Sequence, residues 1–363
     1  MAETLLIAGT RKGLFLARKD GRRWVGEPLQ LPMQAIHAVG VDTRGPGPSP
    51  RLFAGATSEQ WGPTVLHSDD LGRTWQEPEL APIAFPDRIG KALARIWQIH
   101  PGPADQPGVV YAGTEPSALF RSEDGGETFA LNGPLWDHPH RPEWPAGHSG
   151  QALHTVVPYP GRPERILVAM SAGGVYRTTD GGQSWTPSNA GIKATFLPEQ
   201  DRYPEFGQCV HKIAPDAGDP ERLYLQNHDG IYRSEDWGRS WNEAAKGLPG
   251  EFGFALATDP HEPGRAYVFP LAGDEHQFAP DFRRRVYRTE DEGEGWTEFG
   301  QGLPPEAFYS LVLRDALCTD DGNPAGVYFG TRNGELYACE DEHWTTVATG
   351  LPDVLSVRAT VLE

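Results

Sequence analysis

Short apolar runs separated by glycine and aspartate turns follow one another along the whole chain. One set comprises residues 153–160 (LHTVVPYP), 165–171 (RILVAMS) and 174–178 (GVYRT), and Trp185 follows after a turn. Runs of this length that are rich in Val, Ile, Leu and Tyr indicate β-strands, and the glycines indicate the turns between them. Each set therefore predicts four antiparallel strands, with the tryptophan at the start of the fourth.

One motif recurs at the turn between the third and fourth strand of each set. Its pattern is S/T-x-D-x-G-x-T/S followed by Trp or Phe. Clear copies lie at 67–75, 121–129, 177–185, 233–241 and 288–296, and weaker copies lie at 16–24 and 338–346. The aromatic residues of successive copies are 48 to 56 residues apart. Seven units at this spacing predict an all-β fold, a seven-bladed β-propeller with one four-stranded antiparallel sheet per blade, in a single domain spanning 1–363.

The two ends of the chain complement one another. The first unit begins directly with a second strand at residues 5–10 (LLIAGT) and has no first strand. The last unit has its own four strands, the first at 309–315 (YSLVLRD), yet the chain continues with 351–363 (LPDVLSVRATVLE). We expect this C-terminal segment to supply the missing innermost strand of blade one, because closing the ring removes exposed sheet edges.

The motif residues suit a tight hairpin. Glycines such as Gly126 and Gly182 can adopt a positive φ without steric cost. Aspartates such as Asp124 and Asp180 can accept backbone N–H groups across the turn. The aromatic residue that follows can fill the space between neighbouring sheets. We therefore expect these aspartates to be structural and not catalytic.

Charge and cysteine usage limit the classes of partner. The formal net charge is −18, which disfavours nucleic acid and anionic membranes as partners. The three cysteines Cys209, Cys318 and Cys339 have no C-x-x-C spacing, so neither a disulfide framework nor a cysteine-based zinc site is expected. The first residues do not resemble a secretory signal, and no run is long enough to span a membrane. These features predict a cytoplasmic protein.

The repeat resembles the Asp-box, or BNR, repeats of sialidase-like and sortilin-like propellers, and the resemblance covers essentially the whole chain. That superfamily includes sialidases, xyloglucanase-type glycoside hydrolases, sortilin-type receptors and a plant photosystem assembly factor. If the chain were a sialidase, the resemblance would imply four features: an arginine triad, a Tyr–Glu nucleophile pair, an Asp acid/base and an F/Y-R-I-P motif. Residues 85–90 (FPDRIG) depart from that motif, and Arg11 lies in a different context, AGTRKGLF. These departures disfavour sialidase activity.

Long loops suggest where a ligand would bind. Segments 76–95, 131–152, 186–208 and 272–284 are all expected on the face opposite the Asp-box hairpins, which we call the loop face. They carry aromatic, basic and acidic side chains that suit sugars and other polar ligands. The candidate ligand-binding residues on these loops are His148, Arg202, Tyr203 and Glu205. The alternative is that the loops are lids that cover their own hydrophobic groups.

Two arginines are candidates for binding an anion. Arg11 and Arg332 follow the second strands of blades one and seven, which are neighbours in a closed ring. Two guanidinium groups there could clamp a carboxylate or phosphate. The alternative is a ring of salt bridges with Glu115 and Asp229, which occupy the corresponding positions in two other blades.

Histidines recur at one position of the predicted innermost strand. They are His37, His154 and His211, and the corresponding residue in the third unit is Trp97. Because the innermost strands line the channel, three imidazoles could bind a transition metal. The alternative is that they are ordinary buried histidines held by hydrogen bonds.

These features leave three functions open. The first is a scaffold that binds a small molecule, a carbohydrate or a protein on the loop face, with Trp97 among the contacts. The second is a glycoside hydrolase of the sialidase-like or xyloglucanase-like kind, which would need two carboxylates across a cleft. Its leading catalytic candidates are Glu115 and Asp229, with Glu205 and Asp274 as further candidates. The third is a metal-dependent enzyme that uses the channel histidines.

Overall fold

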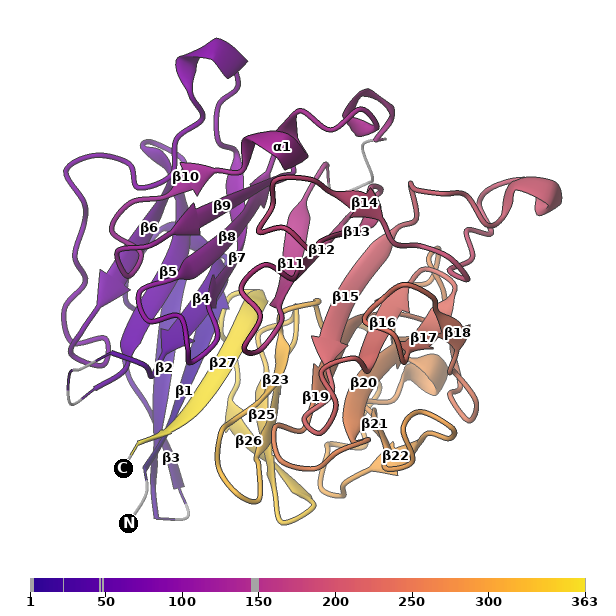
Figure 1. Ribbon diagram of the computed structural model, residues 1–363. Coiled ribbons are helices and arrows are strands. Elements are labelled where there is room, and N and C mark those ends of the chain that lie inside the picture. Colours follow the sequence, from indigo (N-terminus) through magenta and orange to yellow (C-terminus); the bar gives the residue numbers. More distant parts are fainter. Residues whose placement is uncertain (1–2, 22, 46, 48, 145–149, 363) are drawn as a thin grey trace.

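The computed structural model describes residues 3–21, 23–45, 47, 49–144 and 150–362. Seven antiparallel sheets follow one another around a central channel (Figure 1). The innermost strand of each sheet packs against the innermost strand of the next, and that of the seventh sheet packs against that of the first, which closes the ring. The predicted seven-bladed β-propeller is therefore confirmed.

The blades take their strands in chain order, apart from blade one. Blade one contains β27 (Val354–Leu362), β1 (Glu3–Thr10), β2 (Gly13–Asp20) and β3 (Arg23–Gly26). Blade two contains β4 (Gln34–Asp42), β5 (Arg51–Ser58) and β6 (Gly62–Ser68). Blade three contains β7 (Arg95–Pro101), β8 (Val110–Glu115), β9 (Ala118–Ser122) and β10 (Ala130–Leu131). Blade four contains β11 (Leu153–Pro158), β12 (Ile166–Met170), β13 (Gly174–Thr178) and β14 (Thr186–Pro187).

The other three blades follow the same order. Blade five contains β15 (Val210–Pro215), β16 (Leu223–Asn227), β17 (Gly230–Ser234) and β18 (Asn242–Glu243). Blade six contains β19 (Phe252–Thr258), β20 (Ala266–Leu271), β21 (Val286–Thr289) and β22 (Thr297–Phe299). Blade seven contains β23 (Leu317–Thr319), β24 (Val327–Gly330), β25 (Leu336–Glu340) and β26 (His343–Ala348).

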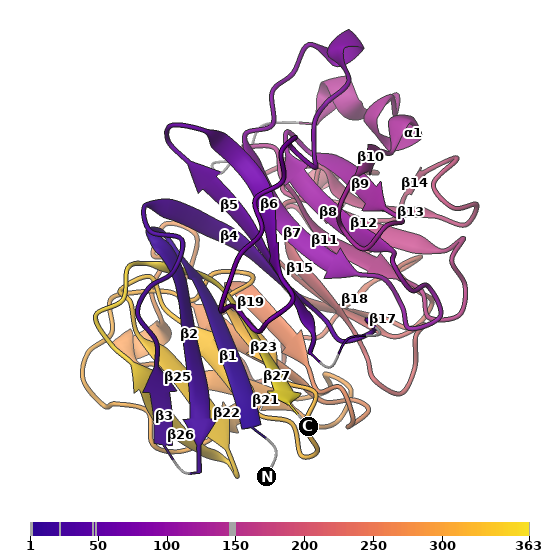
Figure 2. The same cartoon turned by 90° about the vertical axis from the view of Figure 1, so that its left-hand side faces the viewer.

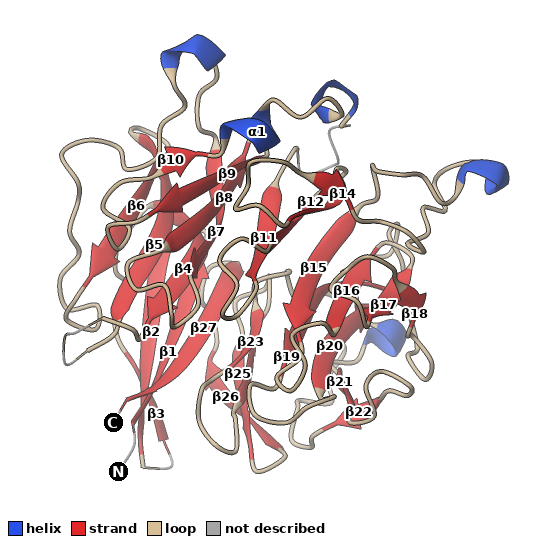
Figure 3. Ribbon diagram, viewed as in Figure 1, coloured by secondary structure: helices blue, strands red, loops and turns tan. Residues whose placement is uncertain are grey.

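Helices in the described residues are short and lie in the loops outside the sheets (Figure 3). They are η1 (Asp87–Ile89), α1 (Gly133–Trp136), η2 (Arg141–Glu143), η3 (Glu199–Asp201) and η4 (Pro280–Phe282). Each is far shorter than the twenty or so apolar residues that a membrane-crossing helix requires, and the described chain contains no such helix.

The C-terminal strand closes the ring as the sequence predicts. β27 pairs antiparallel with β1, for example Leu5 with Thr360 and Gly9 with Ser356. The N- and C-terminal strands therefore lie side by side in one sheet (Figure 2). The pairing joins residues more than three hundred positions apart and leaves blade one without an open inner edge.

Two local expectations differ from the structure. The first strand of blade seven was expected at 309–315, whereas β23 is Leu317–Thr319. Segment 311–316 forms isolated backbone hydrogen bonds instead. At the end of β24, for example, Gly330 N donates to Ala316 O and Arg332 N donates to Leu311 O. Blade two has three strands, and its fourth position is reduced to an isolated bridge between His67 and Gln76. Pro78 and Pro82 follow that bridge and cannot donate to a strand ladder.

The Asp-box aspartates are structural, as expected. In blade two Asp70 accepts the backbone N–H of Thr74 at 2.9 Å and its hydroxyl at 2.7 Å, and Ser68 Oγ accepts the N–H of Gly72 at 2.8 Å. The hydrogen bonds from Thr74 lower the pKa of Asp70 to about 2. The same pattern recurs around Asp180, and Gly182 has φ of 87°. These carboxylates are occupied in holding their own hairpins.

The Asp-box tryptophans join each blade to the one before it. Trp241 of blade five donates its indole N–H to the carbonyl of Ser188 in blade four at 2.9 Å. Trp296 and Trp344 donate in the same way to Ala244 and Phe299 of the preceding blades. Because each indole is buried between two sheets, it both fills space and satisfies a carbonyl that water cannot reach.

Replacing Trp241 with phenylalanine tests this link. The Trp241→Phe variant leaves the buried carbonyl of Ser188 unpaired, which we expect to cost about 1–3 kcal/mol of unfolding free energy. Trp61→Phe is the matched control, because Trp61 is 87% exposed. Urea denaturation followed by circular dichroism measures both. Equal midpoints for the two variants would show that the indole bond does not couple the blades.

Candidate functional site

The innermost strands share an irregularity at the end nearest the loop face. The pairing register slips by one residue between Ile36 and Ala38, between Ile96 and Gln98, between Leu153 and Thr155, and between Val210 and Lys212. The residues at these slips are His37, Trp97, His154 and His211. A β-bulge of this kind turns one side chain away from the regular alternation. The sequence position that aligned these residues is therefore the same structural position, a bulge in the innermost strand, in each of blades two to five.

A cavity of about 830 Å³ opens at this end of the channel. Three kinds of element form most of its wall. The bulge residues His37, Trp97 and His211 line it together with turns between second and third strands and with loops that enter the innermost strands. Contributions from these turns and loops are Arg11, Glu59, Ser171, His228, Asp274, Arg332, Phe196 and Gly207. The cavity thus lies on the loop face, and its volume is in the range of small-molecule sites.

Basic side chains outnumber acidic ones in the cavity wall. The basic residues are Arg11, Lys12, Arg95, Arg314 and Arg332, and the acidic ones are Glu59, Asp274 and Asp315. Asp315 is already paired with two cations, as described below. Basic residues are therefore in the majority among the lining residues, although the whole chain has a formal net charge of −18. Three of these arginines already have a carboxylate partner: Arg95 lies beside Glu115, and Arg11 and Arg332 share Asp353.

Arg314 is the most unusual of these groups. Its side chain is 8% exposed, and its Nη1 atom is buried without a hydrogen-bond partner in the described part of the chain. No carboxylate of the described residues lies within ion-pairing distance of it. Its guanidinium lies 5.1 Å from the ring centre of Trp97, and that of Arg95 lies 4.9 Å from the same ring. Burial lowers the pKa of Arg314, and the charges of Asp315, Cys209 and Glu115 oppose this effect without cancelling it.

A buried ion cluster forms the floor of the cavity. Asp315 Oδ1 accepts from Lys212 Nζ of β15 at 2.7 Å and from Arg358 Nη2 of β27 at 2.9 Å. Burial opposes ionisation of Asp315, but Lys212 and Arg358 outweigh it and hold the pKa of that carboxyl well below its usual range. Lys212 and Arg358 line a second cavity of about 520 Å³ at the opposite ends of the innermost strands. The cluster therefore divides the channel and ties blades five, seven and one together.

Comparisons with known proteins agree with the repeat and the fold. No protein-family model matches the chain. It is 37% identical over 112 residues to the vacuolar protein sorting/targeting protein 10 of Fusarium vanettenii, covering 31% of this chain and 6% of the relative. It is 24% identical over 270 residues to the xyloglucanase Xgh74A of Acetivibrio thermocellus, covering 64% of this chain and 30% of the relative. The chain thus spans less than a third of the length of either relative.

Solved structures give the same picture. An ancestral GH74 enzyme is similar with a TM-score of 0.57 and 18% identity, over 85% of this chain and 38% of that one. YCF48 bound to D1 peptide is similar with a TM-score of 0.52 and 14% identity, over 93% and 86%. At these identities the likeness shows the fold alone. The seven sheets and the Asp-box hairpins observed in this chain decide the class of fold. The chain is an Asp-box β-propeller.

In this propeller Arg11 and Arg332 come together, but around a residue that the sequence analysis did not consider. Arg11 Nε and Arg332 Nη2 lie 3.3 and 3.0 Å from the same oxygen of Asp353, which precedes β27. Both arginines line the cavity and keep much of their surface exposed. The expected alternative partners, Glu115 and Asp229, are not their ion-pair partners among the described residues.

The two candidate catalytic carboxylates are held by other groups. Glu115 accepts from Trp97 Nε1 at 3.2 Å and lies 3.4 Å from Arg95 Nη1. Asp229 accepts the backbone N–H and the hydroxyl of Thr195, in the loop that enters blade five. The cavity lining, as far as the described residues define it, includes neither carboxylate. Glu115 positions the Trp97 indole, and Asp229 fastens a loop.

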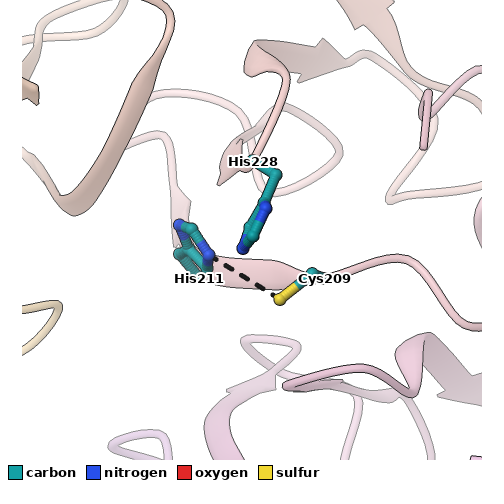
Figure 4. A group of neighbouring side chains, drawn as sticks. All are labelled: Cys209, His211 and His228. Atoms are coloured by element: carbon teal, nitrogen blue, oxygen red, sulfur yellow. Dashed lines mark hydrogen bonds between the residues drawn. The ribbon is translucent and has the colours of Figure 1, made fainter. Parts of the chain in front are cut away.

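The three candidate metal-binding histidines have different surroundings. His37 faces the cavity 5.5 Å from the Trp97 ring, and burial, Arg95 and Arg11 lower its pKa to about 3. His154 is fully buried, with Nε2 2.9 Å from the carbonyl of Val210 and Nδ1 3.0 Å from Thr155 Oγ1. His211 lines the cavity beside Cys209 and His228 (Figure 4). Among the described residues, the set that could share one metal ion is Cys209, His211 and His228.

The loop residues contribute less than expected. Segment 131–152 packs onto blade four, where Trp144 Nε1 donates to Tyr176 Oη at 2.9 Å and His140 Nδ1 lies 3.0 Å from the same oxygen. The described part of that loop therefore acts as a cover for its own aromatic groups. Arg202, Tyr203 and Glu205 lie outside the described cavity lining, and His148 lies outside the described residues.

Sequence reasoning missed Arg314, Asp353, Cys209 and His228. Arg314 was hidden within a segment expected to be a regular strand. Cys209 and His211 carried a usable signal, because a thiol and an imidazole close together in the sequence are both ligands that transition metals prefer. The search for C-x-x-C spacing passed over that C-x-H pair.

The buried ion cluster predicts a strong effect of Asp315→Asn. The substitution leaves the buried Lys212 and the partly buried Arg358 without their counter-charge, and we expect a loss of about 3–5 kcal/mol of stability. Asp105→Asn, at an exposed position, is the control. Thermal unfolding followed by calorimetry compares the two with the wild type. A melting temperature for Asp315→Asn equal to that of the control would mean that the cluster does not hold the blades together.

Proposed function

We propose that this propeller binds a small molecule that carries a carboxylate or phosphate, in the cavity at the loop-face end of its channel. The buried, unpaired guanidinium of Arg314 is the observation that carries the proposal. A buried charge without a partner is costly, and such sites are typically satisfied by a ligand or an ion. Arginine suits this role because its planar fork bonds oxyanions through two N–H groups.

The rest of the cavity wall supports a ligand of mixed character. Trp97 offers a flat apolar surface fixed by Glu115, and His37 beside it is neutral at physiological pH because its pKa is low. Leu311, Leu313, Phe254 and Met33 add apolar surface. Arg11 and Arg332 share a single carboxylate, Asp353, so their donors are not exhausted by it. An organic anion with an apolar body or a sugar ring fits these features.

Binding is favoured over glycoside hydrolysis by the environment of the carboxylates. A glycosidase needs two carboxyl groups that face one another across its cleft, one of them able to donate a proton. Glu115 and Asp229 belong to blades three and five and are engaged with Trp97, Arg95 and Thr195. Because the curated relatives include xyloglucanases, a carbohydrate stays among the candidate ligands. A uronic acid or another sugar acid is both a carbohydrate and an anion.

Removing the Arg314 charge tests the proposal. We expect wild-type protein to bind at least one anionic probe from a panel of D-glucuronate, N-acetylneuraminate and glucose 6-phosphate, with D-glucose as the neutral probe. Arg314→Gln should lower the affinity at least about tenfold, since a charge-assisted bidentate pair contributes roughly 1.5–3 kcal/mol. Isothermal titration calorimetry measures both proteins.

Arg162→Gln provides the matched control, because Arg162 is exposed on the edge of blade four. It should bind like the wild type. Equal affinity of the Arg314→Gln variant and the control for every bound probe would refute the role of Arg314. Binding of glucose as tight as that of its phosphate would refute an anionic ligand.

A hydrolysis assay tests the competing function. We expect no turnover of fluorogenic aryl glycosides, an aryl sialoside included, because neither Glu115 nor Asp229 is placed to protonate a leaving group. Turnover that disappears in a Glu115→Gln, Asp229→Asn double variant would instead make the protein a glycosidase.

A further inference from the structure

Cys209, His211 and His228 form a compact group in the cavity wall. All three belong to blade five: Cys209 precedes β15, His211 is its second residue, and His228 lies in the turn between β16 and β17. Their thiol and imidazole groups point toward one another (Figure 4), and their ligand atoms all lie within 4.8 Å of one another. The Cys209 Sγ to His211 Nε2 distance is 3.8 Å.

The bulge in β15 produces this arrangement. Val210 pairs with Asn227 and Lys212 with Gln226, so His211 is the extra residue and turns toward the cavity. Asn227 is also the last residue of β16, and the turn that it begins carries His228 over the same bulge. The group is therefore fixed by two paired strands, which is the rigid support that a metal site requires.

Each histidine has an outer contact of the kind that orients a metal ligand. His211 Nδ1 is hydrogen-bonded to the carbonyl of Gly253, which makes Nδ1 the donor and leaves the lone pair on Nε2, toward Cys209. His228 Nδ1 lies 3.8 Å from Asp274 Oδ2. A carbonyl or carboxylate behind a ligating imidazole fixes its tautomer and raises its basicity. Burial holds the pKa of His211 well below its usual value, so this imidazole is neutral.

We propose that Cys209, His211 and His228 bind a divalent transition-metal ion of the zinc type, with the fourth coordination position open to the cavity. Tetrahedral zinc with one sulfur and two nitrogen ligands places the ligand atoms about 3.5 Å apart. The Cys209–His211 pair already approaches that spacing. The other separations within the group are at most 4.8 Å, and His228 lies in a turn and is partly exposed, so its side chain is the one placed to adjust.

The chemistry of the donors supports a borderline-soft metal. One thiolate and two imidazoles suit zinc, cobalt or copper and do not suit calcium or magnesium, which prefer oxygen ligands. Burial raises the pKa of Cys209, while Arg314 opposes that effect, and a bound cation deprotonates a coordinating thiol. Because all three side chains line the cavity, the fourth ligand is water or an oxygen atom of a bound molecule.

Cobalt titration tests the site directly. Untagged, reduced protein is freed of metal with a chelator and titrated with Co²⁺ while the absorption spectrum is recorded. We expect one cobalt ion per chain, a thiolate-to-cobalt charge-transfer band and tetrahedral ligand-field bands. Cys209→Ser should abolish the charge-transfer band, and His228→Gln should weaken binding at least about tenfold. Zinc should displace the cobalt.

Controls separate the ligands from their surroundings. Cys339→Ser removes a buried thiol in blade seven, and His37→Gln removes another histidine of the same cavity; both should bind cobalt like the wild type. Far-ultraviolet circular dichroism confirms that each variant is folded, and His228→Gln alone decides the matter should Cys209→Ser fail to fold. Absence of a charge-transfer band in the wild type, or an unchanged titration of His228→Gln, would overturn the proposal.

Arg314→Gln should retain the metal, which distinguishes this site from the proposed anion site.

Discussion

Ring closure is the constraint on which the rest of the structure depends. A single four-stranded blade has two apolar faces and can bury them only between two neighbours. The pairing of β27 with β1 gives blade one its innermost strand, so every blade has a neighbour on each side. The indole bonds of Trp241, Trp296 and Trp344 act in the same direction around the ring, each from one blade to the one before it. The close approach extends to the backbone, since a β-carbon at Gly113 would collide with the carbonyl oxygen of Leu153 in the next blade.

The same closure forms the cavity at the loop-face end of the channel. Innermost strands that converge on one axis bring their first residues together, and the bulges turn His37, Trp97 and His211 into the resulting cavity. Asp315 is neutralised by Lys212 and Arg358 on the floor, whereas Arg314, its neighbour in sequence, has no such partner. The two adjacent residues therefore differ in their role. Asp315 forms ion pairs that hold blades together, whereas the guanidinium of Arg314 can still pair with a ligand.

Much of the fold could be predicted from sequence, because it depends on short local patterns. The Asp-box turn needs only Asp, Gly and a hydroxyl residue at fixed spacing, and the repeat of that turn predicts seven blades. The alignment of His37, Trp97, His154 and His211 likewise found one structural position per blade. What each of these side chains contacts could not be predicted, because it depends on the next blade. His154 is held by the carbonyl of Val210, whereas His211 is held by that of Gly253 with its other nitrogen free to face Cys209. Arg314 and Asp353 could not be recognised from the sequence. Arg314 matters because it has no ion-pair partner among the described residues, and Asp353 matters because two arginines share it. Both features depend on the three-dimensional arrangement.

Electrostatics decides whether an acidic protein can attract an anion into such a cavity. The formal net charge of −18 repels anions at a distance. At physiological ionic strength, however, exposed charges are screened beyond about 8 Å. A molecule inside the cavity therefore experiences mainly the nearby groups. There the buried Arg314 has no ion-pair partner among the described residues, whereas Arg11 and Arg332 share Asp353 and Arg95 lies beside Glu115. Burial strengthens these interactions further, because the effective dielectric constant around Arg314 is lower than that of water. The acidic surface then affects mainly the rate at which an anion arrives, while the cavity determines how tightly it is held.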